Sequence, residues 1–398
     1  MALLLWGCGP EVTAGPEEPA APPASNEEPP PPPDDGDPDD PGDPDVPAPL
    51  TYPLACHPIY SEDLLPTFEL EVSEQNWALL RQEFQEDPSR ETEFPATFRY
   101  AGEVYPDATI RLRGNHSQCG DKMQFAIAFN KVDRAGRFRG LRRLNLDHGG
   151  CYHLEERLAL SYLRDVGLPT ACANHARLMV NGAYYGLFSN IEHINQDFLK
   201  RQFPGAENDG DLWKSGHVLK TNEETTPENE IETFWRVRTL PEIDAYVDLD
   251  EAVLEWAAEA VLPACDNYWL YAWNYYLYDH PQRGLLWVPT DLDCSWALLE
   301  DEVERDIFFP TPLQKPADVV LADPAWRQKY LAAVRHSVSR MDVAKLEARA
   351  DRWWAQIAEA ARTDPHVPYT EAQVQRFKDG LRRRRVWLDA WVREHAAP

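Results

Sequence analysis

Four side chains with metal-binding oxygen atoms lie near one another in the sequence: Asp266, Asn274, Asp291 and Asp293. Two apolar runs, 275–278 and 285–288, flank the turn-rich segment DHPQRG and predict a β-hairpin. Because a hairpin returns the chain to where it began, the first two side chains are expected near its entrance and the last two near its exit. Such hard oxygen ligands suit Mg²⁺ or Mn²⁺. Solvated loop ends are the alternative, because Asp and Asn are common turn residues.

Basic residues that could contact phosphate lie upstream, in TIRLRGNHSQCGDKMQFAIAF (109–129). Arg111 and Arg113 alternate with apolar residues and are expected on the polar face of a strand, where Arg suits bidentate contacts to oxyanions. In the strand-like run KMQFAIAF, Lys122 is expected on the face opposite Met123, pointing away from the apolar side. Lys122 is the candidate phosphate lysine, and a solvated surface lysine is the alternative. The RGN segment is not a GxGxxG loop, so a backbone phosphate cradle is not indicated.

The elements between these two groups have clear boundaries. The segment LEERLALSYLRDVG has helical apolar spacing and ends at Gly167, with Pro169 beyond, which predicts a helix. The pair Asn181-Gly182 joins two apolar runs and predicts a second hairpin. From about Trp326 the chain is expected to be helical to its end. The RRRR run at 382–385 indicates an exposed, partly ion-paired helix surface more than a site for acidic partners.

Taken in order, these blocks resemble the spore coat protein H-like (CotH) kinase family from about Thr109 to about Trp296. The resemblance rests on RGN-x-S followed by Lys and an alternating strand, then NG-x-YYG, NYYLYD and the D-x-D of VPTDLD. It implies an α+β, atypical protein-kinase-like fold, with a mixed β-rich N-terminal part and a mainly helical C-terminal part. The family also implies ATP binding and phosphorylation of secreted or surface proteins.

The order Asp, Asn, hairpin, Asp is that of the catalytic base and the two metal ligands in protein kinases. Asp266 is accordingly the candidate base that orients the substrate hydroxyl. Asn274 and Asp291 are the candidate metal ligands, and Asp293 is either a second metal ligand or a structural acid.

The remaining candidate residues would hold the nucleotide. Glu155 or Glu156, in the first turn of the expected helix, would orient Lys122. Glu192 ends the strand at which kinases place the adenine hinge, and Lys214 follows in GDLWKSG; both match family positions.

Two departures from the family pattern bear on activity. Thr290 stands where the family usually has Trp before its D-x-D, and Trp296-Ala297 stands where a Phe-Gly or similar pair usually follows. The acids themselves are kept, so the departures weaken the expectation of an ordinary active enzyme without removing it.

Composition limits the partners. The net charge of −28 argues against nucleic acid as a partner. The sequence has no run of 18 or more apolar residues, so no membrane-spanning helix is predicted. The start, MALLLWGCGP, resembles the end of a bacterial lipoprotein signal with lipid attached to Cys8. It lacks a basic n-region, so an incidental apolar terminus is the alternative. Residues 9–50 are rich in Pro, Asp and Glu and are expected to form an extended, disordered tether.

Six cysteines remain if Cys8 is lipidated, which suggests up to three disulfides in an exported protein. Cys265 adjoins Asp266, and Cys294 adjoins Asp293. If the hairpin brings those acids together, it also brings the two cysteines together, so a Cys265–Cys294 bridge is expected. A zinc site is the competing interpretation, but the sequence lacks a C-x-x-C pair.

The expected organisation is a truncated signal (1–8), a tether (9–50), a β-rich flank (51–108) and the kinase-like domain (109–398). The leading functional hypothesis is an exported, lipid-anchored protein kinase. It would use ATP with Mg²⁺ or Mn²⁺ to phosphorylate Ser or Thr of surface or envelope proteins. The alternatives are a catalytically silent binding or envelope-structural module and nucleotidyl transfer on the same fold.

Overall fold

The computed structural model describes residues 56–114, 120–149, 153–227, 229–296 and 303–396. The chain divides into a unit 1–42 and a unit 43–398, and every described residue belongs to the second. The expected lipid site at Cys8, the tether and Ala297 lie outside the described residues. Among the helices that are described, none is both long and apolar enough to cross a membrane.

Seven strands close into a barrel in the order β1-β2-β3-β4-β5-β7-β6. The barrel closes through parallel pairing of β1 with β6, and all its other pairs are antiparallel. Phenylalanine side chains from several strands fill its interior, among them Phe68, Phe98 and Phe129. The strands are β1 (Thr67–Glu71), β2 (Phe94–Tyr100), β3 (Glu103–Leu112), β4 (Phe125–Ala128), β5 (Arg143–Asp147), β6 (Ala173–Val180) and β7 (Ala183–Ile191).

Local sequence signals explain the elements around the barrel. Helix α1 (Glu74–Glu86) begins where the Ser73 side chain accepts a hydrogen bond from the Asn76 N–H. The helix predicted after residue 154 is confirmed as α2 (Glu155–Val166), and Gly167 ends it with φ 106°. The hairpin predicted at Asn181-Gly182 is also confirmed, because it joins β6 to β7.

The expected strand around Lys122 is only partly confirmed. Strand β4 begins at Phe125, three residues after Lys122, and all four of its residues are buried. Lys122 is itself fully buried, which corrects the expectation that it lies on a solvent-facing polar surface. Strand periodicity failed here because both sides of this part of the chain are covered, so alternation does not separate core from solvent.

The second sheet has four strands in the order β11-β10-β8-β9. Strands β10 (Tyr275–His280) and β11 (Gly284–Pro289) pair antiparallel from Tyr275↔Pro289 to His280↔Gly284, which confirms the predicted hairpin. Strand β8 (Asp211–Lys214) pairs with the edge of β10 that faces away from β11. The other edge of β8 pairs with β9 (Val218–Leu219).

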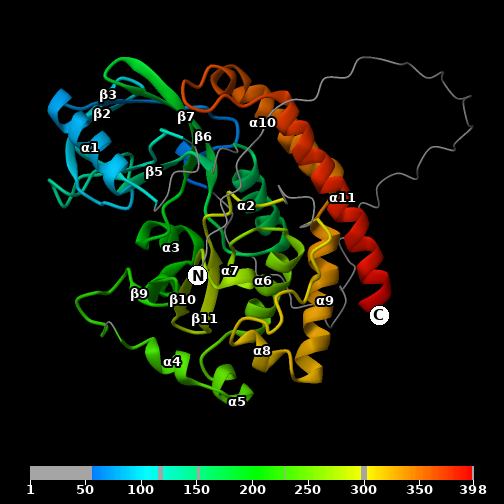
Figure 1. Ribbon diagram of the computed structural model, residues 1–398. Helices are drawn as coiled ribbons and strands as arrows, with labels where there is room; N and C mark the ends of the chain where they lie inside the picture. The colour runs from blue at the N-terminus through cyan, green and yellow to red at the C-terminus, as the bar shows by residue number, and fades with distance from the viewer. Residues whose placement is uncertain (1–55, 115–119, 150–152, 228, 297–302, 397–398) are drawn as a thin grey trace, which may run out of the picture. The chain divides into compact units, whose positions relative to one another are not determined.

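Helices cover this sheet and continue to the end of the described chain. Helix α6 packs against α9 and β11, and α11 runs beside α9 and α10 (Figure 1), so the helical C-terminal part is as expected. The helices are α3 (Gln196–Gln202), α4 (Glu232–Arg236), α5 (Leu240–Asp244), α6 (Leu249–Val261), α7 (Tyr268–Tyr271), α8 (Ala317–Val320), α9 (Pro324–Arg340), α10 (Val343–Arg362) and α11 (Glu371–His395).

Candidate active site

The β10–β11 hairpin brings its two flanking loops into contact. Asn274 immediately precedes β10 and Thr290 immediately follows β11, and the Thr290 N–H donates to the Asn274 carbonyl at 2.9 Å. The Asn274 side-chain amide donates to the carbonyl of Asp266 at 3.2 Å and to that of Asp291 at 3.3 Å. One carboxamide therefore connects the loop of the candidate base to the loop of the candidate metal ligand.

A disulfide reinforces this connection. Cys265 and Cys294 are bridged, as predicted, and the Cys265 N–H also donates to the Cys294 carbonyl at 3.0 Å. The bridge rules out the competing zinc site at these two sulfur atoms, since a disulfide sulfur is not a thiolate ligand.

The same loops carry unusual backbone conformations. Asn274 and Asp291 both have φ of 57°, and Trp296 has φ of 71°. Such values are uncommon for residues other than glycine, although Asn and Asp tolerate them best. Left-handed residues held by surrounding structure concentrate at functional sites, so this backbone supports the assignment of function to these loops.

Glu156 of α2 joins the acids of the hairpin loops. Its side chain is fully buried, and its pKa is raised well above the ordinary value by burial and by the charges of Asp291 and Asp293. The pKa of Asp293 is likewise raised by burial, Asp291 and Asp266. We call Glu156, Asp266, Asp291 and Asp293 the carboxylate cluster.

The carboxylate cluster is chemically suited to a divalent cation. Among the described residues, Glu156 Oε2 is buried without a hydrogen-bond partner. Carboxylate and carboxamide oxygens are the donors that Mg²⁺ and Mn²⁺ prefer. A bound dication would favour the ionised carboxylates and so oppose the burial and the repulsion that raise these pKa values. The donor set therefore fits the metal that the sequence implies.

Two cations face the carboxylate cluster. Arg113, just beyond β3, forms an ion pair with Asp147, and its charge partly offsets the rise in the pKa of Glu156 and of Asp293. Lys214, the last residue of β8, interacts electrostatically with Arg113 and Asp291, and burial lowers its pKa. A phosphate group between these cations and a cluster-bound metal would be neutralised from both sides.

Sequence reasoning missed the residues at the end of β5. Asp147 is buried and accepts a hydrogen bond from the Gly149 N–H at 2.9 Å. With the Gln124 amide nitrogen turned toward it, that nitrogen lies 2.7 Å from both Asp147 oxygens. Burial, with the charges of Lys122 and Arg113, lowers the pKa of His148 to about 3, so this imidazole is neutral. The sequence LNLDHGG does contain a signal for these residues, because Asp147 and His148 stand between a strand-like run and a Gly-Gly pair.

Lys122 and Glu156 do not form the expected pair. The Lys122 ammonium lies 2.7 Å from Asp364 and 2.5 Å from the Leu187 carbonyl. Asp364 follows α10, far along the chain, so no local pattern indicated it. Lys122 still influences the site, because its charge lowers the pKa of His148.

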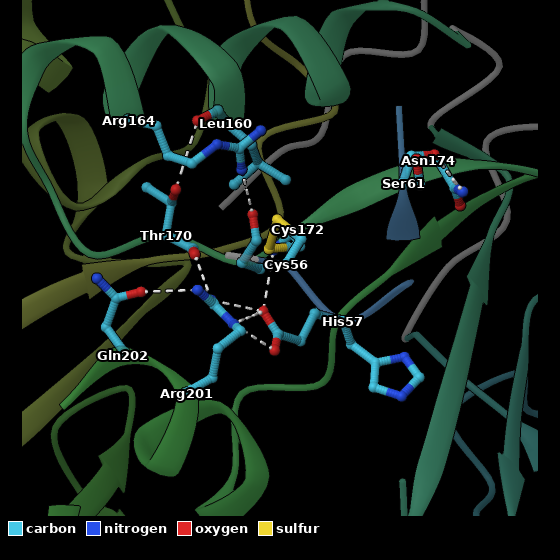
Figure 2. Close-up of a disulfide and its surroundings, with 12 residues drawn as sticks. Cys56, His57, Ser61, Leu160, Arg164, Thr170, Cys172, Asn174, Arg201 and Gln202 are labelled. Carbon is cyan, nitrogen blue, oxygen red and sulfur yellow. Dashed lines mark hydrogen bonds and ion pairs between the residues drawn. A yellow bond between two sulfur atoms is a disulfide. The ribbon is translucent and has the colours of Figure 1, made fainter. Parts of the chain in front are cut away.

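Two further candidates have other partners. Arg111 forms ion pairs with Glu91 at 2.7 Å and with Glu93 at 3.7 Å. Glu192 lies 2.6 Å from the Arg201 guanidinium and accepts from the Cys172 N–H at 3.0 Å. Figure 2 shows Arg201 beside the disulfide that joins Cys56 to Cys172. The carboxylate of Glu192 is therefore engaged within the protein.

Thr290 and Trp296, the positions that depart from the family pattern, are accommodated differently. Thr290 holds the hairpin exit through its backbone hydrogen bond to Asn274. The Trp296 ring is buried against Tyr162 and Phe377, and its Nε1–H donates to the Glu155 carbonyl at 3.1 Å. Trp296 thus anchors the D-x-D loop to α2, the helix that carries Glu156.

Comparison with known proteins places these features in a family. The chain is 24% identical over 261 residues to the inner spore coat protein H of Bacillus subtilis (strain 168), an alignment covering 58% of this chain and 69% of that protein. Among solved structures, the Helicobacter pylori proinflammatory kinase CtkA aligns with a TM-score of 0.37 at 9% identity, covering 76% of this chain and 92% of that chain.

A second structural neighbour is HipA of Shewanella oneidensis MR-1, from a toxin–antitoxin complex with HipB and operator DNA. It aligns with a TM-score of 0.36 at 15% identity, covering 82% of this chain and 74% of that chain. Both TM-scores are low, so the family assignment rests on sequence. The family model described as CotH kinase protein matches residues 110–390, which include the whole carboxylate cluster together with Arg113 and Lys214. The chain belongs to the CotH kinase protein family.

Proposed function

We propose that this protein is an exported atypical protein kinase that transfers the γ-phosphate of ATP to Ser or Thr hydroxyls of surface or envelope proteins. The observation that carries the proposal is the convergence of the carboxylate cluster with Arg113 and Lys214. Phosphoryl transfer depends mainly on positioning and on neutralising charge, and this site offers metal-binding acids on one side and cations on the other.

Each residue has a role in this proposal. Asn274 and Asp291 would hold Mg²⁺ or Mn²⁺, with Asp293 as a second metal ligand or a structural acid, and the metal would neutralise charge on the phosphates. Asp266 accepts the proton of the substrate hydroxyl, and Arg113 and Lys214 bind phosphate oxygens. The hydrogen bonds of Asn274 and the Cys265–Cys294 disulfide keep the base at a fixed distance from the metal ligands.

Export is supported by the two disulfides among the described residues, because disulfides persist in oxidising compartments. Cys8 would carry the lipid anchor and residues 9–50 would be the tether, and both are proposed from sequence alone. In this arrangement the substrates are proteins of the cell surface or envelope, and the membrane is contacted only through the lipid.

The deciding experiment is incubation of the purified chain with envelope proteins, Mn²⁺ and ATP labelled at either the γ- or the α-phosphate. Transfer of the γ-label to Ser or Thr, lost in Asp291→Asn, is the expected result. Transfer of the α-label would show nucleotidyl transfer and contradict the proposed kinase activity. If neither label is transferred, whether or not ATP binds, the kinase proposal fails and the catalytically silent binding or structural module is the remaining hypothesis.

A further inference from the structure

A cavity of about 380 Å³ lies away from the carboxylate cluster, and none of the cluster's residues lines it. Four parts of the chain form its walls: α1, the segment before β4, the β6–β7 hairpin and the connection from α10 to α11. Its volume is within the range of sites that hold small ligands or a few peptide residues. The residues that matter for its chemistry are Trp77, Arg81, Phe84, Tyr184, Tyr185 and His366.

The walls of this cavity, which we call the aromatic cavity, carry several aromatic rings that contact one another. Trp77 meets Tyr185 edge-on with ring centroids 5.6 Å apart, and Tyr185 contacts the His366 ring at 4.5 Å. The Tyr185 hydroxyl accepts a hydrogen bond from the Met123 N–H at 3.1 Å. All three rings remain partly exposed, so a large apolar side chain placed here would remove aromatic surface from water.

The polar groups of the aromatic cavity favour an anion. The Asp121 carboxylate is already engaged by the His366 ring, whose Nδ1 lies 2.8 Å from an Asp121 oxygen. Arg81 is exposed and has no hydrogen bond or ion pair with any residue that the structure describes. Arg suits carboxylates because it can form two parallel hydrogen bonds to them.

We propose that the aromatic cavity binds an acidic peptide segment that carries one large apolar side chain. The apolar side chain packs against the exposed faces of Trp77 and Tyr185, and a neighbouring carboxylate meets Arg81. Gln85, exposed at the rim, offers an amide that both donates to and accepts from a peptide backbone. Aromatic and arginine side chains in pockets commonly supply most of the binding energy at protein–protein interfaces.

Binding at the aromatic cavity would also join separate parts of the fold. The His366 N–H donates to Asp364 at 2.9 Å, and Asp364 pairs with Lys122 behind the cavity wall. A bound peptide therefore contacts α1, the β6–β7 hairpin and the connection that holds this buried ion pair. The inference concerns binding alone and does not depend on the proposed kinase activity.

Fluorescence polarisation with a fluorescein-labelled peptide containing Asp-Phe-Asp between glycines tests the proposal at physiological salt. Arg81→Glu removes the cation, and Ala183→Phe fills the cavity from an exposed position on its wall. Each is expected to weaken binding at least tenfold with an unchanged melting temperature. Arg134→Glu makes the same charge change at an exposed turn beyond the opposite end of β4 and should leave binding unchanged.

Control peptides separate the two parts of the proposed ligand. Replacing Phe by Ala, or both Asp by Lys, is expected to abolish specific binding. Equal binding of all three peptides, equal binding by the Arg81→Glu and Ala183→Phe variants, or no binding of any peptide would overturn the proposal. Complete displacement of the peptide by an equal concentration of 3-phenylpropionate would instead assign the aromatic cavity to small aromatic acids, which also overturns it.

Discussion

Replacing Asp266 or Asp291 by Asn removes the negative charge and keeps nearly the same side-chain shape. Asp266→Asn and Asp291→Asn are expected to lower the rate of phosphoryl transfer by about a thousandfold or more, because each removes a base or a metal ligand. Both residues are partly exposed, so the protein should stay folded. Transfer from γ-labelled ATP and circular dichroism measure the two effects. Asp107→Asn, at an exposed position on β3, is the matched control, and near-normal activity in both site variants would refute the assignment.

The partner of Lys122 could not be predicted from the sequence. Its partner Asp364 accepts hydrogen bonds from the N–H groups of Leu187, His366 and Val367 as well as the ammonium. Asp364 is 242 positions further along the chain, and no spacing rule could connect the two. Glu156 was predicted to orient Lys122, but the charged groups beside it include Asp291 and Asp293 of the hairpin loop.

Lys122→Ala is now expected to destabilise the fold. Removal of one partner leaves Asp364 as an uncompensated buried charge, which costs about 3–5 kcal/mol of the free energy of unfolding. Urea denaturation measures this loss. The double variant Lys122→Met with Asp364→Asn should recover part of it, because no charge is then left alone. Wild-type stability of Lys122→Ala would show that the ammonium faces solvent after all.

At the scale of elements, local signals predicted both hairpins and α2, because turn residues and apolar runs fix them within a few positions. The Cys265–Cys294 bridge followed from the hairpin. Helix α6 is different. Its residues Glu251, Glu255 and Glu259 recur every fourth position, which would ordinarily indicate a charged, solvent-facing stripe, yet all three are buried. Only the packing of α6 against β11 and α9 reveals that this stripe faces the core.

These glutamates make the stability of the protein depend on pH. Burial raises the pKa of Glu251 and of Glu259 to about 8, and burial with the neighbouring carboxylates raises that of Glu255. The folded state therefore keeps protons that the unfolded chain releases above its ordinary pKa of 4.5. This contribution to the free energy of unfolding is complete below about pH 4.5 and is lost as the pH rises to about 8.

Glu255→Gln should raise the melting temperature at pH 8 more than at pH 5, since a neutral amide carries no proton to lose. Differential scanning calorimetry between those pH values measures the slope. Glu223→Gln, an exposed position beyond β9, should change neither melting temperature nor slope. A wild-type slope in Glu255→Gln would mean that Glu255 is already solvated in the folded protein.

At the scale of the whole fold, the candidate metal site lies where separate elements meet. Glu156 comes from α2, Arg113 follows barrel strand β3, and Asp291 and Asp293 follow the hairpin of the second sheet. Sequence order could place the hairpin acids together but could not show that α2 supplies a fourth carboxylate. A dication that binds only when these elements are assembled stabilises the folded state by mass action, about 2.7 kcal/mol at a hundredfold excess over Kd.

Mn²⁺ or Mg²⁺ should accordingly raise the melting temperature, and EDTA should reverse the rise. Because burial and the acidic neighbours raise the pKa of Asp293, protons compete with the metal, so the rise in melting temperature should grow as the pH increases. Asp293→Asn separates two effects: it relieves repulsion and should raise the melting temperature without metal, while reducing the response to Mn²⁺. Asp107→Asn should behave as the wild type in both conditions. If Asp293→Asn is instead destabilised without metal, hydrogen bonds rather than a metal hold the carboxylate cluster together. That result would contradict the metal assignment without affecting the hairpin geometry.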